Sequence, residues 1–375
     1  MSGVEQLQIV GNKMLVRGLK LAVSIMPIRD PELLVGVDAV SRLAEFIAGR
    51  SVEKVLIVTG AGIVRRGQTD ELVTALEKEG IETVIFTGVL PDPTFAVVNE
   101  GLDMLRQENC DSVVAFGGGS AMDAAKVIAV AAANKCHPER LAGYFKGRKK
   151  PLPLFAVPTT AGTGSEVTIA SVISDDTSHA KAFVIDSRTV PLAAALDPGL
   201  MQSIPPALTA ATGMDALTHA LEAYLSTIAT PETDQDAIEA TRLIFDNLPA
   251  AFSDGSNLQA REAMSLAAFK AGKAFTRASV GYVHAISHQL GAHYGTAHGL
   301  GTFAESEADL AQKMLAGIST LNEQLDIPEK APDLLETDIP GIARGALKEA
   351  LLNYPVPRHL SRSDCEELLR TLLPA

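Results

Sequence analysis

The sequence predicts two domains, an α/β domain over residues 1–195 and an all-helical domain over residues 196–375. Three observations predict this division. Apolar, β-branched runs alternate with helical stretches through the first half of the chain. Such runs are absent after residue 207, where the pattern is that of successive helices. The chain of 375 residues is also long enough for two domains of ordinary size.

The composition is that of an ordinary globular protein, and its charge excludes several classes of partner. The chain is 47% hydrophobic and 21% charged, with a net charge of −13, and its longest basic run is the short GRKK at 147–150. We therefore expect neither nucleic acid nor an anionic membrane as a partner. Three scattered cysteines, no 18-residue apolar span and no signal-peptide pattern predict a cytoplasmic protein without disulfides. The apolar segment 14–26 contains Arg17 and Lys20 and predicts a packed strand, a helix or an oligomer arm.

The first half of the chain predicts a doubly wound, Rossmann-like sheet. A β-branched run ending in glycine is typical of a buried parallel strand, and each such run here is followed by a helical stretch. Gly80 ends the first helix, and the PDPT sequence at 91–94 begins the second. The expected order is a strand at 54–60, a helix at 69–79, a strand at 82–88, a helix after 94 and a strand at 111–116. Right-handed crossovers would place these strands in one parallel sheet.

The turn Gly117–Ser120 follows the third strand and opens a helix. Its three glycines let backbone approach a ligand closely, and Ser120 with the first helical N–H groups would donate to an anion such as a pyrophosphate. Asp123, one turn into the helix, is expected to face the same crevice. The turn alone does not decide the matter, because it is not G-x-G-x-x-G and glycine turns after strands are common.

A second loop, PTTAGTGSE at 158–166, has two glycines and four hydroxyl residues in nine positions. It is either a solvated turn or a hydroxyl-rich cradle for ribose and phosphate oxygens, facing the Gly117–Ser120 turn. Two further strands are expected at 167–174 and 182–187. Lys181 lies just before the second of them, where it suits either a cofactor contact or the protein surface.

In the helical half, residues 208–226 form a nearly all-apolar stretch that contains Asp215 and His219, four residues apart. Side chains at this spacing lie on one face of a helix. An uncompensated charge in such a buried helix is costly, so Asp215 requires a strong partner.

Residues 281–301 hold four of the eight histidines. If residues 282–294 are helical, His284 and His288 lie on one face and His293 points about 180° away. Gly295 would end the helix and let His298 return toward His284. Asp215, His219, His284 and His298 would then supply one oxygen and three nitrogens, a set that suits Fe(II) or Zn(II). The alternative for any one histidine is a hydrogen-bonded core residue.

Five motifs together resemble one family, the iron-containing (group III) alcohol dehydrogenases, over roughly residues 33–300. The motifs are GGGSAMDAAK, PTTAGTGSEVT, DPGL, TAATGMDALTHALEAY and HAISHQLGAHYGTAHG, in the family's order and spacing. The resemblance implies a dinucleotide-binding domain and an all-helical metal-binding domain, in the architecture of dehydroquinate synthase, with the active site in the cleft between them. It implies hydride transfer between a small alcohol or aldehyde and NAD or NADP, with the substrate oxygen at the metal, and a homodimer.

The resemblance also implies roles for individual residues. The family's ligand positions match Asp215, His219, His284 and His298. His288 matches a histidine of the cleft that is not a ligand, and it is a candidate proton relay. The positions associated with the cofactor match Gly118, Gly119, Ser120, Asp123, Thr159, Thr160, Thr163 and Lys181.

The chain departs from the family pattern at two places. Many members have an aspartate where this chain has Gly60, and that acid would bond a ribose hydroxyl and repel a 2′-phosphate. With Arg65 and Arg66 nearby, Gly60 leaves NAD and NADP both open. The segment after His298 is short, which leaves a catalytically degenerate assembly protein as an alternative. A glycerol-dehydrogenase-like polyol oxidoreductase, which shares the architecture, is another. An enzyme like dehydroquinate synthase would need more basic residues for its phosphorylated substrate.

Overall fold

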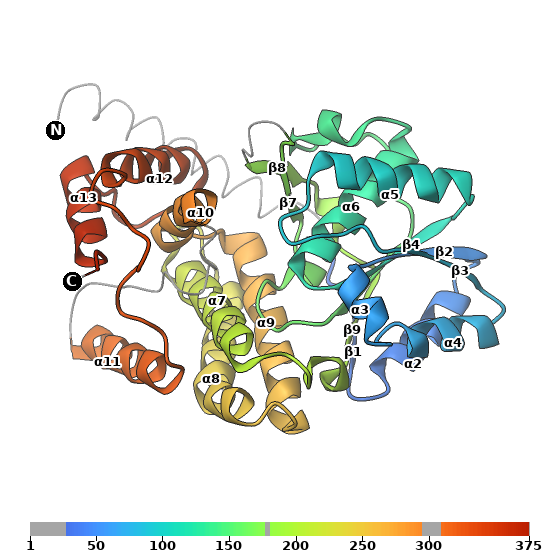
Figure 1. Ribbon diagram of the computed structural model, residues 1–375, viewed down its shortest axis with the longest axis horizontal. Helices are drawn as coiled ribbons and strands as arrows, with labels where there is room; N and C mark the ends of the chain where they lie inside the picture. The colour runs from blue at the N-terminus through green and yellow to red at the C-terminus, as the bar shows by residue number, and fades with distance from the viewer. Residues whose placement is uncertain (1–27, 177–180, 295–308, 375) are drawn as a thin grey trace.

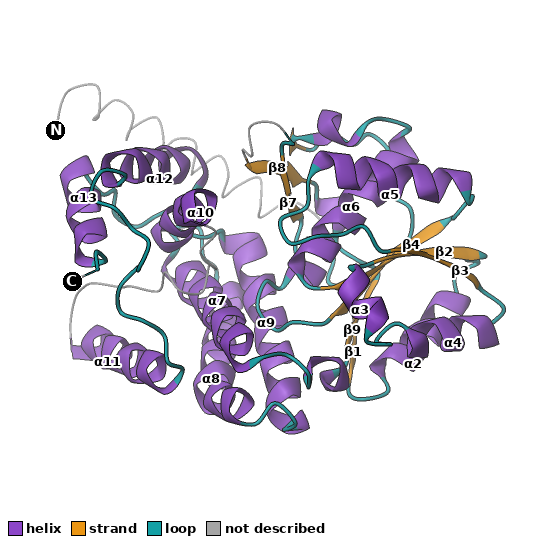
Figure 2. Ribbon diagram, in the orientation of Figure 1, coloured by secondary structure: helices purple, strands orange, loops and turns teal. Residues whose placement is uncertain are grey.

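The computed structural model describes residues 28–176, 181–294 and 309–374. The first half of the chain forms an α/β unit, and the second half packs beside it as a group of helices (Figure 1). Colouring by secondary structure shows the same division, with strands confined to one side of the molecule (Figure 2). The predicted fold class is confirmed, and every pairing in the main sheet is parallel.

The main sheet has six strands in the order β1-β9-β6-β4-β2-β3. Their bounds are β1 Glu32–Val35, β2 Lys54–Val58, β3 Glu82–Phe86, β4 Ser112–Gly117, β6 Leu154–Pro158 and β9 Ala193–Leu196. The sequence predicted β2, β3 and β4 but not β1, β6 or β9. The four residues of β9 are Ala-Ala-Ala-Leu, which has none of the β-branched character on which the strand predictions depended.

Helices cover both faces of this sheet, because successive side chains of each buried strand point to opposite sides. In β2, Val55 and Ile57 pack in one apolar cluster with α2 Ala39–Ala48 and α4 Asp70–Lys78. Leu56 and Val58 pack in another cluster with α5 Phe95–Gln107 and α6 Gly119–Asn134. The carboxyl ends of the strands therefore form one edge between two helical layers, from which the short helix α3 Ala61–Arg65 also starts.

The two later strands that the sequence predicted belong to a separate small sheet. β7 Ala170–Ser174 and β8 Lys181–Ile185 form an antiparallel pair, and β5 Gly143–Tyr144 joins β8 in parallel. The predicted strand at 167–174 begins later than expected, at Ala170, and Ser165–Val167 form a single 3-10 turn before it. Three further 3-10 turns are Pro138–Leu141, Ser187–Thr189 and Pro198–Met201.

Beyond β9 the described chain contains helices and turns only. The helices are α7 Pro206–Leu225, α8 Pro231–Ser253, α9 Leu258–Ala278, α10 Tyr282–Tyr294, α11 Asp309–Gln324, α12 Ile339–Asn353 and α13 Arg362–Thr371. Reciprocal hydrogen bonds between Thr230 and Thr233 fix the start of α8, and the Asn257 side chain accepts a bond from the Ala260 N–H at the start of α9. The chain therefore breaks before Pro231, and it breaks again between the end of α8 and Leu258.

The described helices bury three apolar clusters, two of them formed mainly by α7, α8 and α9 and the third by α10, α12 and α13. α7, α8 and α9 pack together, and α10 packs against α12, which in turn contacts α13 (Figure 1). All three cysteines are free thiols. No helix within the described ranges has both the length and the apolar character needed to span a bilayer.

Candidate metal centre

Helix α7 presents three polar side chains on one face of an otherwise apolar surface. Asp215, His219 and Glu222 are spaced at i, i+4 and i+7, and at roughly 100° per residue they fall within about 60° of one another. All three are buried, with exposed fractions of 8%, 7% and 9%. Small residues around them let neighbouring helices approach closely, and a Cβ at Gly213 would lie 2.4 Å from Leu248.

Helix α10 brings His284 to this face. Its Nε2 lies 3.7 Å from Asp215 Oδ1, and His219 Nδ1 lies 3.9 Å from Asp215 Oδ2. Ligand atoms of Asp215, His219 and His284 all fall within 4.8 Å of one another. The structure therefore brings together three of the four residues that the sequence suggested as ligands. The fourth, His298, lies outside the described residues.

The two imidazoles of this cluster stack on each other. The ring centroids of His219 and His284 are 4.4 Å apart, and Phe275 of α9 stacks on the other face of His219 at 4.2 Å. His219 is thus held between two rings, so its orientation is fixed by packing.

Glu222 fixes His284, and the sequence analysis did not identify it. Its Oε2 lies 2.5 Å from His284 Nδ1, and its Oε1 accepts a 2.7 Å bond from the Val283 N–H in the first turn of α10. A Cβ at Gly281 would lie 2.9 Å from Glu222 Oε1, so glycine leaves room for the carboxylate. With Nδ1 bonded to Glu222, His284 presents Nε2 toward Asp215, as expected of a metal-ligating histidine backed by a carboxylate.

The charges of this cluster favour a cation. Burial alone would lower the pKa of His284, but Glu222 and Asp215 raise it to about 10. Burial would raise the pKa of Glu222, and the neighbouring His284 lowers it below its ordinary value. Two buried carboxylates thus hold a proton on the His284 imidazole, and a divalent metal would displace that proton. The donors, one carboxylate and two imidazoles with a carboxylate behind one of them, fit Fe(II) or Zn(II).

His288 lies one turn beyond His284 on α10. Its ring centroid is 6.0 Å from that of His284 and 6.2 Å from that of Phe183 in β8. His288 is therefore placed between the metal-ligand cluster and the small sheet of the α/β unit. His293 is exposed and its Nδ1–H donates to the Gln289 carbonyl, so it points away from the cluster, as the spacing predicted.

The two glycine-containing loops lie against each other at the carboxyl edge of the main sheet. Thr159 N–H donates to the Gly117 carbonyl at 2.9 Å. A Cβ at Gly118 would lie 3.1 Å from Thr160 Oγ1, and one at Gly119 would lie 2.8 Å from Thr163 Cγ2. The loop at 158–166 therefore faces the Gly117–Ser120 turn, which is one of the two alternatives that the sequence left open, and side chains at these glycines would separate the two.

Ser120 and Lys181 lie near each other because Asp92 joins them. Ser120 Oγ accepts a 3.4 Å bond from the Asp92 N–H, and the Asp92 carboxylate pairs with the Lys181 ammonium. Ser174 Oγ donates to the same carboxylate at 2.9 Å. Partial burial lowers the pKa of Lys181 from its ordinary value. Lys181 is thus part of a polar group at the start of α6 rather than an isolated surface lysine.

Asp123 differs from its expected position facing the crevice, because both its oxygens accept bonds from the protein. Oδ1 accepts from Ser165 Oγ at 2.8 Å, and Oδ2 accepts from the Val172 N–H at 2.9 Å. The buried Lys126, which the sequence analysis did not single out, donates at 2.9 Å each to Ser165 Oγ, Thr168 Oγ1 and the Ala170 carbonyl. Burial lowers the pKa of Lys126 to about 8. Asp123 and Lys126 together fasten the second loop and β7 to α6.

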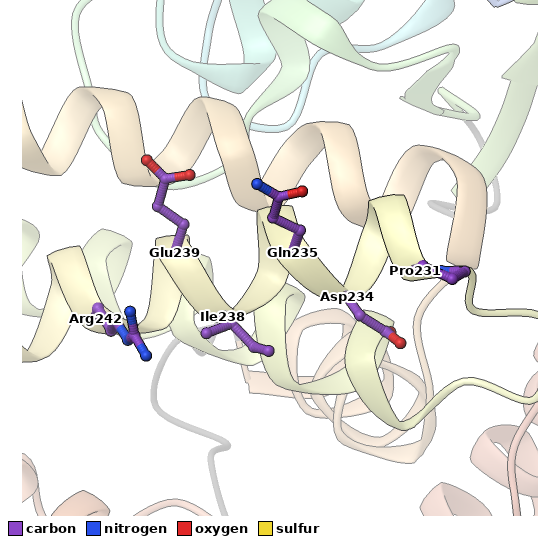
Figure 3. Close-up of a pocket in the computed structure, with 6 residues that line it drawn as sticks. All are labelled: Pro231, Asp234, Gln235, Ile238, Glu239 and Arg242. Carbon is purple, nitrogen blue, oxygen red and sulfur yellow. The ribbon is translucent and has the colours of Figure 1, made fainter.

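A hollow on the surface of α8 is separate from these residues. It is lined by Pro231, Asp234, Gln235, Ile238, Glu239 and Arg242, most of which are exposed on one helix (Figure 3). None of them belongs to the metal-ligand cluster or to the loops around the main sheet, so we assign this hollow no part in the site.

Two family models match the chain in succession. The model described as iron-containing alcohol dehydrogenase matches residues 30–198, and the model described as the C-terminal part of the Fe-containing alcohol dehydrogenase family matches residues 209–305. The first therefore covers the α/β unit, and the second covers the helices that hold Asp215, His219 and His284.

Individual relatives agree with these matches. The chain is 45% identical to alcohol dehydrogenase 4 of Schizosaccharomyces pombe over 267 residues, which is 71% of this chain and 63% of that protein's length. It is 40% identical to 1,3-propanediol dehydrogenase of Klebsiella pneumoniae over 84% of this chain and 90% of that one. Among solved structures, a 1,3-propanediol oxidoreductase superposes with a TM-score of 0.88 at 36% identity, covering 93% of this chain and all of that one. An alcohol dehydrogenase from Oenococcus oeni superposes with a TM-score of 0.87 at 32% identity, covering 92% and 99%. The chain belongs to the iron-containing alcohol dehydrogenase family.

Proposed function

We propose that the protein is a metal-dependent, NAD(P)-linked alcohol dehydrogenase or aldehyde reductase. It would transfer a hydride between a small alcohol or aldehyde and nicotinamide. The observation that carries the proposal is the buried cluster of Asp215, His219 and His284, with Glu222 bonded to the far side of His284. Two relatives are named for their substrates, 1,3-propanediol dehydrogenase and lactaldehyde reductase, and these names support a small, oxygenated substrate.

We propose Fe(II), or Zn(II) in its place, as the metal, with Asp215, His219, His284 and His298 as ligands. When bound, the cation would supply Lewis-acid polarisation of the substrate oxygen. The residues of this chain would hold the reacting groups in place and keep the site dry, since Asp215, His219 and His284 are all buried. His288 would accept the proton of the substrate hydroxyl as the hydride leaves, or return it in the opposite direction. Its place between His284 and Phe183 supports this role.

The cofactor would lie at the carboxyl edge of the main sheet, with its pyrophosphate on the Gly118–Ser120 backbone at the start of α6. Thr159, Thr160, Thr163 and Lys181 would bind its remaining oxygens, and Asp123 would act by holding the second loop. A methanol dehydrogenase of Bacillus methanolicus that is 43% identical is described as NAD-dependent, which supports a nicotinamide cofactor.

Gly60 would decide how the adenosine ribose is recognised. It ends the segment after β2 and begins α3, which carries the exposed Arg65 next to Arg66. A Cβ at Gly60 would lie 3.0 Å from the Val89 carbonyl, so even a small side chain here is tight. Without an acid at this position, the chain does not reject a 2′-phosphate by charge, and we propose that it accepts NADP(H) as well as NAD(H).

We also propose a domain division near residue 195, a homodimer and a cytoplasmic location without nucleic-acid or membrane partners. The division is supported by the end of β9 at Leu196 and the start of α7 at Pro206. The short segment after His298, which lies partly outside the described residues, would shape the substrate site.

Steady-state oxidation of NADH and NADPH with short aldehydes, on metal-loaded protein, tests the proposal. We expect turnover with both nucleotides, and we expect Gly60→Asp to reduce NADPH use relative to NADH use by about tenfold or more. Gly60→Ala is the matched control, since it adds the same Cβ near Val89 without a charge. Absence of turnover with every aldehyde would contradict the function. An unchanged nucleotide ratio in Gly60→Asp would contradict the placement of the ribose.

A further inference from the structure

His288 is bonded to a carboxylate from a different helix. Its Nδ1 lies 2.5 Å from Oε1 of Glu349, which comes from α12, 61 residues further along the chain. Both side chains are largely buried, with exposed fractions of 16% and 14%. The pair thus lies within the contact between α10 and α12 and is shielded from bulk water.

Two further donors hold the Glu349 carboxylate. Tyr354 O–H donates to Oε1 at 2.5 Å, and Gln289 Nε2 donates to Oε2 at 3.2 Å. Burial alone would raise the pKa of Glu349, but the bonds from His288, Tyr354 and Gln289 lower it below its ordinary value. The group is therefore a carboxylate at neutral pH, and its two oxygens are engaged on different sides, so it cannot rotate without breaking a bond.

The surrounding backbone is shaped to admit this arrangement. A Cβ at Gly345, one turn before Glu349 on α12, would lie 2.2 Å from Gln289 Oε1. Glycine at this position therefore leaves room for the Gln289 side chain in the rotamer that reaches the carboxylate. Tyr354, just beyond the end of α12, is buried with an exposed fraction of 8%, so its hydroxyl is held in place by packing.

We propose that Glu349, clamped by Tyr354 and Gln289, is the positioning residue for His288. A carboxylate that accepts from Nδ1–H selects the tautomer with its proton on Nδ1, which leaves the lone pair on Nε2. The inference rests on the proposed function, in which His288 takes the substrate proton. In that step the hydroxyl O–H bond breaks, its electron pair stays on oxygen and a bond forms from Nε2 to hydrogen. The imidazolium then lies beside the Glu349 carboxylate, and it releases the same proton from Nε2 to water.

A double-mutant cycle on the metal-loaded protein separates this role from general stabilisation of the helices. Glu349→Gln keeps the shape of the side chain but has only one oxygen for three donors, so we expect kcat to fall by about tenfold or more with bound metal unchanged. In a His288→Gln background the same change should have almost no further effect on kcat, because Glu349 acts through His288. An equal loss of kcat in both backgrounds, or no loss in either, would overturn the inference.

Tyr294→Phe provides the matched control. Tyr294 O–H donates to the Asp338 carboxylate, so this change removes a second bond between α10 and the start of α12, away from His288. We expect this variant to lower Tm while leaving kcat within about twofold of the wild-type value. A fall in kcat as large as that of Glu349→Gln would show that helix packing alone accounts for the effect and would overturn the inference.

Nitrogen NMR of histidine-labelled, Zn(II)-loaded protein gives a result that does not depend on activity. We expect the His288 resonances, identified by their loss in His288→Gln, to show a proton fixed on Nδ1 in the wild type and a change of tautomer population in Glu349→Gln. An identical His288 spectrum in both proteins would overturn the inference even if the enzyme is active. A protein without dehydrogenase activity would contradict the proposed function, while this spectrum would still decide whether Glu349 sets the tautomer.

Discussion

Replacing Glu222 by glutamine probes how the metal centre is organised. In the wild type, one carboxylate oxygen lies 2.5 Å from His284 Nδ1 and the other accepts the Val283 N–H at 2.7 Å. Glutamine has one acceptor oxygen and one amide NH₂ group. If its oxygen stays on Val283, its NH₂ faces His284 Nδ1 and moves the imidazole proton to Nε2, the atom next to Asp215. If its oxygen turns to His284, the NH₂ group faces the Val283 N–H and that bond is lost. The first arrangement therefore reverses the bond to His284, and the second breaks the bond to Val283.

The expected size of the effect depends on the position of Glu222 behind a ligand. Loss of such a partner typically weakens metal binding by 10- to 100-fold, or about 1.4–2.7 kcal/mol. Competition with a chromophoric chelator at neutral pH measures the dissociation constants for Zn(II) of wild type and Glu222→Gln. Metal-free Glu222→Gln should also be less stable than metal-free wild type, because the change removes the counter-charge of a protonated His284.

A buried carboxylate elsewhere in the helical half supplies the control. Asp236 of α8 is 9% exposed and pairs with Lys270 and Lys273, away from the cluster. Asp236→Asn should lower Tm and leave the Zn(II) dissociation constant unchanged. Equal metal affinity in Glu222→Gln and wild type would refute the idea that Glu222 sets the ligand atom of His284, and so would an equal loss in Asp236→Asn.

Two further predictions concern the loop at 158–166. Burial raises the pKa of Glu166 from its ordinary value of 4.5 to about 7. Between these two pH values the folded protein therefore keeps a proton on Glu166 that the unfolded chain loses. The free energy of unfolding of the wild type should therefore fall by roughly 3 kcal/mol more than that of Glu166→Gln between pH 4.5 and pH 7. Urea denaturation at a series of pH values measures both, and the same pH dependence in the two proteins would contradict this prediction. A Cβ at Gly272 of α9 would lie 2.7 Å from the Gly164 carbonyl. Gly272→Ala should lower the free energy of unfolding by about 1–3 kcal/mol and raise KM for the nucleotide. Gly341→Ala is the control, because nothing lies within 4 Å of its Cβ, and it should be neutral or stabilising. An unchanged KM in Gly272→Ala would count against the idea that α9 supports the loop.

Much of the fold can be predicted from local patterns in the sequence. The helix expected at 282–294 is α10 Tyr282–Tyr294, and its four-residue histidine spacing places His284 and His288 near each other. The strands that were predicted are those with β-branched, continuous apolar runs. β1 and β9 were missed because each is only four residues long, and each depends on pairing with the other across some 160 residues of chain.

The residues that support the site were harder to predict, because their function depends on partners far away in the chain. Glu222 shares a face of α7 with Asp215 and His219, so its seven-residue spacing from Asp215 is a signal in the sequence that places it beside the cluster. Lys126 gave a signal like that of Asp215, because it is a charged residue in a nearly all-apolar helix, but its partners cannot be read from the sequence. Glu349 gave no such signal, and only the packing of α10 on α12 buries it beside His288.

Metal content and turnover, measured on one anaerobic preparation, test the metal centre most directly. We expect about one Fe(II) or Zn(II) per chain, loss of aldehyde-dependent NADH oxidation when a chelator removes it, and recovery when metal is added back. Asp215→Asn should bind neither metal under the same conditions and show no turnover. Turnover that persists in the metal-free wild type, or metal bound equally well by Asp215→Asn, would contradict a metal centre built on Asp215, His219 and His284.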